Sequence, residues 1–194
     1  MSPKLEPQPP AVALIGGGPV ALECLNLLYE LNTVGRCQII GISATHQVPT
    51  YNMMVENRAK ALGIVMGMNP TNLLEAEPEI CLSIGNGWIV PDELLNRPKR
   101  GIINFHAGPL PSYRGAAVSA FAILNGEDSF GVTFHKVSSQ LDCGPIIHRE
   151  IFSIDDSMTA GELDDACIQV GISVLKQELQ GWIDGKYVEQ QQAE

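Results

Sequence analysis

The residues around position 104 place a carboxamide and an imidazole two positions apart, at Asn104 and His106. They belong to a short apolar stretch, residues 102–106, whose composition is typical of a buried β-strand. Because side chains alternate along a strand, Asn104 and His106 are expected on the same face. A hydrogen-bonded pair inside the core would explain them. Taken alone, the two residues favour that interpretation. A reactive site is the other one, since open α/β sheets place active sites at the carboxyl ends of their strands.

A carboxylate, Asp142, follows in residues 138–145, a loop rich in turn-forming residues. A turn cap is one interpretation of Asp142, and acyl transfer to an amine is the other. Histidine exchanges protons near neutral pH, and an asparagine amide donates to the oxyanion of a tetrahedral intermediate. An aspartate keeps the imidazole charged and accepts the proton that the amine releases. This chemistry requires a fold that brings Asp142 to His106.

The stretch from residue 84 to residue 147 resembles the folate-dependent formyltransferase family. Members share an Asn-x-His motif, a Leu-Pro turn soon after it, and a distant Asp-x-Gly-x-Ile loop. In this sequence the motifs are residues 104–106, Leu110-Pro111 and residues 142–146. Further segments look like the family's methionyl-tRNA and amino-sugar members, namely residues 113–117, 123–127 and 131–133.

The resemblance implies a 10-formyltetrahydrofolate donor and a catalytic set of Asn104, His106 and Asp142. No metal site is expected, because the sequence has no CxxC or HxxxH spacing. It also implies a donor site lined by Trp88, Ile89, Val90, Gly108, Pro109, Leu110, Pro111 and Leu141. A core aromatic after a strand is the other interpretation of Trp88. His135 and His148, away from these motifs, are interpreted as structural or surface histidines.

The resemblance leaves the acceptor open. Glycinamide ribonucleotide formyltransferases carry a Gly-Ser-Asn loop after the first strand, whereas residues 17–20 here are Gly-Gly-Pro-Val. Methionyl-tRNA enzymes carry a further C-terminal domain, which is not expected here. We therefore expect a small-molecule or carrier-tethered amine, such as an amino sugar or an amino-acid derivative, with a possible place as a module or associate of a larger synthetase. A Rossmann-type nucleotide-binding protein and a non-catalytic binding module are the alternatives of another class.

The elements that must position these residues alternate between strand-like and helix-like patterns, which predicts βαβ units. The expected fold is α/β, with a doubly wound, mainly parallel sheet of the Rossmann-like formyltransferase type. Thr159 and Glu162 have the spacing of a capping box. Strands are predicted at residues 11–15, 38–43, 64–68, 79–84, 102–106, 131–137 and 145–152, and helices at 20–31, 51–62, 115–124 and 159–182.

Three glycines, residues 16–18, follow the first predicted strand. A tight turn is one interpretation, and a loop that contacts substrate is a second. Dinucleotide binding is the third, because Ala21 stands at the sixth position of a G-x-G-x-x-G/A pattern. Residues 43–46 contain no acid to bind a ribose, and the loop has no Walker A lysine.

The composition of the sequence disfavours some partners and cellular locations. The 194 residues carry 12 basic and 22 acidic side chains, a formal net charge of -10, which disfavours nucleic acid as a partner. Five scattered cysteines, with no signal peptide and no membrane-spanning stretch, indicate the cytoplasm. We expect one catalytic domain at residues 11–185, with flexible tails at residues 1–10 and 189–194.

Overall fold

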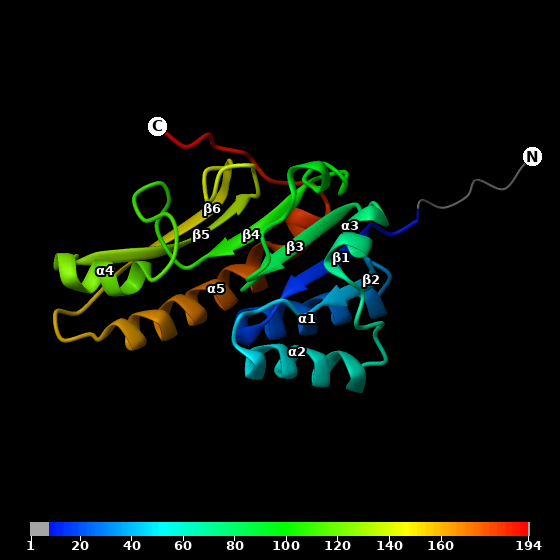
Figure 1. Cartoon of the computed structure of the whole chain (residues 1–194), viewed down its shortest axis with the longest axis horizontal. Helices are drawn as coiled ribbons and strands as arrows, with labels where there is room; N and C mark the ends of the chain where they lie inside the picture. Colours follow the sequence, from blue (N-terminus) through cyan, green and yellow to red (C-terminus); the bar gives the residue numbers. More distant parts are fainter. Residues whose placement is uncertain (1–7, 194) are drawn as a thin grey trace, which may run out of the picture.

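Six strands form a single sheet in the computed structural model, which describes residues 8–193. Their order across the sheet is β2-β1-β3-β4-β5-β6 (Figure 1). β1 pairs in parallel with β2 and β3, and β3 pairs in parallel with β4, whereas β5 and β6 continue the sheet in antiparallel pairing. The prediction of a mainly parallel sheet is confirmed. The strands are β1 (Ala11–Gly16), β2 (Gln38–Ser43), β3 (Ile80–Ile84), β4 (Ile102–His106), β5 (Ser129–Lys136) and β6 (Ile146–Ser153).

Helices cover both faces of the sheet, as a doubly wound fold requires. α1 (Gly18–Thr33) and α5 (Ala160–Ile183) pack together on one face, and α2 (Pro49–Ala61) packs on α1 (Figure 1). The opposite face of β1 and β3 is covered by α3 (Pro70–Glu75) and the short helix η1 (Asp92–Leu94). α4 (Val118–Asn125) lies against α5 at the far end of the molecule.

The last helix, α5, begins where its sequence predicts. The Thr159 side chain accepts a hydrogen bond from the Glu162 backbone N–H, and the Glu162 carboxylate accepts one from the Thr159 backbone N–H. This capping box satisfies two backbone donors that a helix start leaves unpaired. Within residues 8–193, no helix combines the length and apolar content that a membrane crossing requires.

Several segments differ from expectation. Residues 64–68 contribute only an isolated bridge, Met66 to Ile42, in place of a strand. The helix expected from residue 115 begins at Val118, because Gly115 and Ala117 have φ values of 91° and 54°, which a right-handed helix excludes. α3 and η1 were not predicted, since six and three residues are too short to show a periodic pattern.

Residues 1–10 and residues 189–194 are the two segments expected to be flexible tails. Most of residues 1–10 lies outside the described residues. Residues 189–194, expected as a loose tail, are held at two points in their described part. The Gln190 backbone exchanges two hydrogen bonds of 2.8 Å with Ile146, and the Gln192 side chain binds the loop after β5.

Candidate active site

Strand alternation gives β4 and β5 one apolar face and one polar face. Ile103 and Phe134 belong to the same core as the buried residues of α5, and the Phe105 ring lies directly against Gly171 of that helix. The side chains between them must therefore face away from α5. These are Asn104 and His106 of β4 and Thr133 and His135 of β5.

A loop of residues 107–115 folds over this polar face. The buried Thr133 hydroxyl holds it, donating to the Gly108 carbonyl at 2.7 Å and accepting from the Leu110 backbone N–H at 3.1 Å. Arg149 donates to the Leu110 carbonyl at 2.8 Å from β6. Side chains of the antiparallel strands β5 and β6 thus hold this loop against the sheet.

Asp142 reaches the same face from the loop after β5. Its carboxylate accepts a 2.9 Å hydrogen bond from the Gly115 backbone N–H. One oxygen lies 3.6 Å from Nδ1 of His106 and the other lies 3.5 Å from Nε2 of His135. The structure therefore brings together the aspartate and the histidine that the sequence singled out.

Asn104 lies beside these residues, and both its carboxamide oxygen and its carboxamide nitrogen form hydrogen bonds. Its Oδ1 accepts from the Ser83 hydroxyl at 3.0 Å. Its Nδ2 donates to the Phe105 carbonyl at 3.2 Å and to Nε2 of His135 at 3.1 Å. The orientation of the amide is consequently fixed from both ends.

His135, interpreted from sequence as a structural or surface histidine, lies in the centre of this cluster and is almost fully buried. Its Nδ1 lies 2.8 Å from the Lys136 carbonyl, which only accepts, so Nδ1 carries a proton. Its place follows from the register that pairs His135 with Asn104 across β4 and β5. That register depends on the antiparallel pairing, which the sequence pattern did not specify.

The protonation of the His106 ring is determined by opposing effects on its pKa. Its Nε2 lies 2.5 Å from the Tyr113 carbonyl, so Nε2 carries a proton. Burial lowers the pKa of His106, while the Asp142 carboxylate and the Tyr113 carbonyl act in the opposite direction without reversing it. The sequence led us to expect that Asp142 keeps His106 charged, whereas the lowered pKa favours a ring that is mainly neutral at neutral pH.

Asp142 stays ionised in this setting. Burial by itself raises the pKa of Asp142, but the neighbouring His135 and His106 side chains and the Gly115 backbone N–H together lower it. A carboxylate and a neutral imidazole then stand side by side, an arrangement that can receive a proton and stabilise it.

The residues expected at the donor site lie in different environments. Ile89 and Leu141 are 85% and 71% exposed, whereas Val90 is buried and Trp88 packs against the core beneath η1. Gly108 is buried against the His106 ring, with Pro109 and Pro111 partly exposed beside it. Over residues 8–193, no three His, Cys, Asp or Glu side chains are arranged to hold a metal ion.

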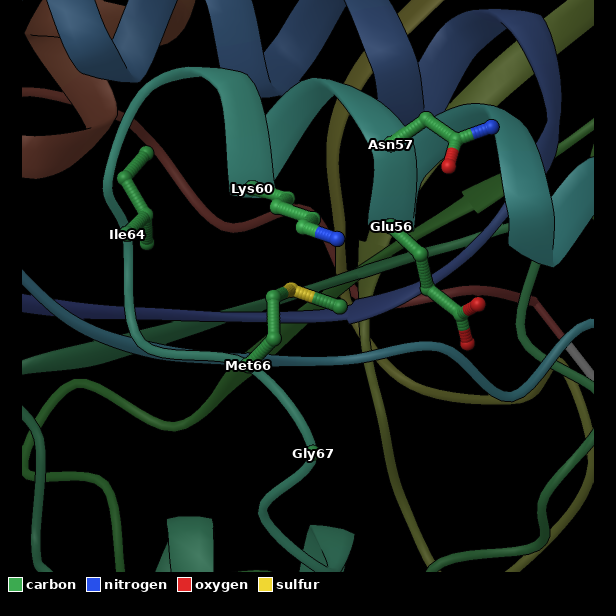
Figure 2. A pocket seen from close by; sticks show the side chains of 6 residues that line it. All are labelled: Glu56, Asn57, Lys60, Ile64, Met66 and Gly67. Atoms are coloured by element: carbon green, nitrogen blue, oxygen red, sulfur yellow. The ribbon is translucent and has the colours of Figure 1, made fainter.

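Two surface hollows lie elsewhere. The larger, about 400 Å³, lies between α2 and residues 64–67, where Glu56 and Lys60 face Met66 across it (Figure 2). Because Met66 bridges to β2, this hollow lies beside an edge strand three places from β4, or roughly 14 Å at the usual strand spacing. The smaller, about 250 Å³, is lined by His46, Gln47 and residues 85–87, after the neighbouring strand β3.

The glycine loop after β1 packs tightly against the end of β3. A Cβ on Gly16 would lie 1.8 Å from the Ile84 carbonyl oxygen, and the Gly17 backbone N–H donates to that same oxygen at 3.0 Å. Gly16 also has a φ of 135°, which favours glycine. Close packing of a tight turn therefore accounts for Gly16.

Comparison with known proteins places these features in one family. A model described as formyl transferase matches residues 42–179. The methionyl-tRNA formyltransferase of Clostridioides difficile is 31% identical over 183 residues, which cover 87% of this chain and 58% of that protein. The corresponding protein of Clostridium beijerinckii is 38% identical over 120 residues, or 62% of this chain and 39% of that protein. The matched segments thus span 58% and 39% of the lengths of these two relatives.

Solved structures share the fold. The sugar 3N-formyl transferase WlaRD, solved with dTDP and 5-N-formyl-THF, has a TM-score of 0.82 at 23% identity, covering 97% of this chain and 68% of its own. Glycinamide ribonucleotide transformylase 1 from Symbiobacterium toebii has a TM-score of 0.78 at 17% identity, covering 97% and 96%. Together with the family model and the sequence relatives, the motifs on β4 and after β5 lead to one conclusion: the chain belongs to the formyl transferase family.

Proposed function

We propose that this chain transfers a formyl group from 10-formyltetrahydrofolate to an amino group, using Asn104, His106 and Asp142. The observation that carries the proposal is the convergence of these three side chains on one face of β4, with the Asp142 carboxylate 3.6 Å from the His106 ring. Family membership supplies the reaction class, and the geometry supplies a role for each group.

Asn104 is proposed to stabilise the oxyanion. When the amine nitrogen bonds to the formyl carbon, the carbonyl electron pair moves to oxygen, and a positioned N–H offsets the new charge. Nδ2 donates to the neighbouring Phe105 carbonyl at 3.2 Å and to Nε2 of His135 at 3.1 Å. We expect the N–H that faces Phe105 to turn to the oxyanion, while His135 keeps the amide in place.

His106 and Asp142 are proposed to move the proton. A neutral His106 accepts it from the attacking amine, and the resulting imidazolium is stabilised by the Asp142 carboxylate. The proton then passes to the folate nitrogen as the bond between that nitrogen and the formyl carbon breaks. The products are the N-formylated acceptor and tetrahydrofolate, so atoms and charge balance.

Two exposed apolar side chains are suited to bind the folate donor. Ile89 follows β3 and Leu141 directly precedes Asp142, so both lie on loops next to the proposed chemistry. Burying such surface against a planar pterin would be favourable, at about 25 cal/mol for each Å² removed from water. Trp88 is adjacent to Ile89, so its fluorescence can report donor binding.

The acceptor that we propose is a small-molecule or carrier-tethered amine, with an amino sugar or amino-acid derivative favoured. A net charge of -10 gives no general attraction for the phosphates of a nucleic acid. Methionyl-tRNA is the second candidate, because methionyl-tRNA formyltransferases are the relatives at 31% and 38% identity.

A direct acceptor screen tests the proposal. Purified protein is mixed with 10-formyltetrahydrofolate and one acceptor at a time, and tetrahydrofolate release is followed by absorbance at one stated salt concentration. The panel contains nucleotide-linked amino sugars, amino acids, glycinamide ribonucleotide and charged initiator tRNA. Transfer to a small amine is the expected result. Faster transfer to the tRNA would favour the second candidate, and no transfer to any member would count against the proposed reaction.

A further inference from the structure

The side chain of Gln192 joins the two loops that hold Asp142. Its Nε2 donates to the carbonyls of Asp142 and Gly144, at 2.8 and 2.7 Å. Its Oε1 accepts two hydrogen bonds from the Arg114 guanidinium, at 3.2 and 2.9 Å. Arg114 directly precedes Gly115, whose backbone N–H binds the Asp142 carboxylate. One amide group thus contacts both the Asp142 turn and the loop that receives its carboxylate.

The turn at Asp142 has a left-handed backbone. Its φ of 53° is uncommon for a residue other than glycine, although aspartate adopts it more often than most residues do. A strained conformation of this kind persists only when surrounding contacts fix it. Gln192 is half-buried, and its two N–H donors meet carbonyls on both sides of the turn.

Gln192 is itself brought to this place by a series of anchors. Lys136 at the end of β5 donates to the Tyr187 hydroxyl at 2.8 Å and lies over its ring. Gln190 then pairs with Ile146 at the start of β6. Residues 186–192 therefore return past the β5–β6 loop, where Figure 1 shows the C-terminal segment beside it.

We propose that Gln192 is a positioning residue, which sets the distance between the Asp142 carboxylate and the His106 ring by clamping the Asp142 turn to the Arg114 loop. Its importance for catalysis rests on the proposed function, whereas its effect on the geometry can be measured without any substrate. The role belongs to the segment expected to be a loose tail, and none of the family motifs includes it.

The experiment is a histidine-selective NMR pH titration of the whole chain, in which only four histidines contribute signals. A His106→Gln protein identifies the His106 resonance. Gln192→Ala is compared with wild type, with Asp142→Asn, and with Gln191→Ala as the matched control, because Gln191 is the exposed neighbour. Gln192→Met keeps the length of the side chain and replaces the alanine variant if that one folds poorly.

Because the Asp142 carboxylate acts to raise the pKa of His106, releasing it should lower that pKa. In Gln192→Ala we expect a decrease toward the value found in Asp142→Asn, as for loss of a neighbouring opposite charge. Gln191→Ala should titrate like wild type. If His106 titrates identically in the Gln192 and Gln191 variants, the proposal is overturned. Formyl transfer is assayed separately, so an inactive wild type would sink the proposed function without deciding this titration.

Discussion

Replacing His135 by leucine tests whether this buried ring holds the Asn104 amide. Leucine has a similar volume but no ring nitrogen, so Asn104 loses one acceptor and Asp142 loses a neighbour at 3.5 Å. One N–H of the Asn104 amide is then left without an acceptor, which costs about 1–3 kcal/mol in a buried site, while the contacts of Asn104 with Ser83 and Phe105 remain. We therefore expect roughly 2 kcal/mol of lost stability, and a kcat that is about 10- to 100-fold lower because the oxyanion donor is no longer fixed.

The matched control is His148→Leu on β6. The Nε2 of His148 has no hydrogen-bond partner, and the Glu150 carboxylate 3.5 Å away is largely exposed, so this contact contributes little. Urea unfolding should show a change within about 0.5 kcal/mol, with unchanged turnover. Stability is read from the unfolding midpoint, and turnover from single-turnover formyl transfer to the acceptor found in the screen. If His135→Leu transfers formyl as fast as His148→Leu, the positioning of Asn104 by His135 is refuted.

Four further results are expected. Gly108→Ala should lower turnover at least 10-fold, because its Cβ would lie 2.7 Å from Nε2 of His106, whereas Gly161→Ala, with no atom within 4 Å, should be active and slightly stabilised; equal activity of the two would contradict the packing argument. The rate should be flat above about pH 6.5 and decline below it as His106 takes a proton, since burial lowers its pKa; a rate that declines from pH 6 to 8 would indicate the charged ring as the active form. Asp142 should add stability above the ordinary pKa of a carboxyl, lost as acid protonates it through its lowered folded pKa, and urea titrations of Asp142→Asn should lack that part of the pH dependence. Thr159→Ala should remove about 1 kcal/mol of stability without changing turnover, and a larger effect on rate than on unfolding would be unexpected.

Much of the fold could be predicted from sequence because its signals are local. Buried parallel strands give continuous apolar runs, such as the residues of β1, and a capping box marks the start of α5. α3 gives no such signal, since six residues are fewer than two helical turns.

The parts of the site that depend on residue type and strand alternation could be predicted from the sequence. The parts that depend on tertiary contacts could not. Asn104 and His106 share a face because of strand alternation alone. His135 enters through cross-strand register, and Gln192 through a segment that returns to the sheet from far along the chain. The charge state of His106 depends on burial, which the sequence motif does not reveal.

The most direct test of the central claim is single-turnover formyl transfer from 10-formyltetrahydrofolate by wild type and His106→Ala, with donor affinity measured in parallel by quenching of Trp88 fluorescence. Loss of a general acid–base group should slow transfer by about 100-fold or more while donor affinity changes only a few-fold. Transfer by His106→Ala at close to the wild-type rate would contradict the assignment of this site.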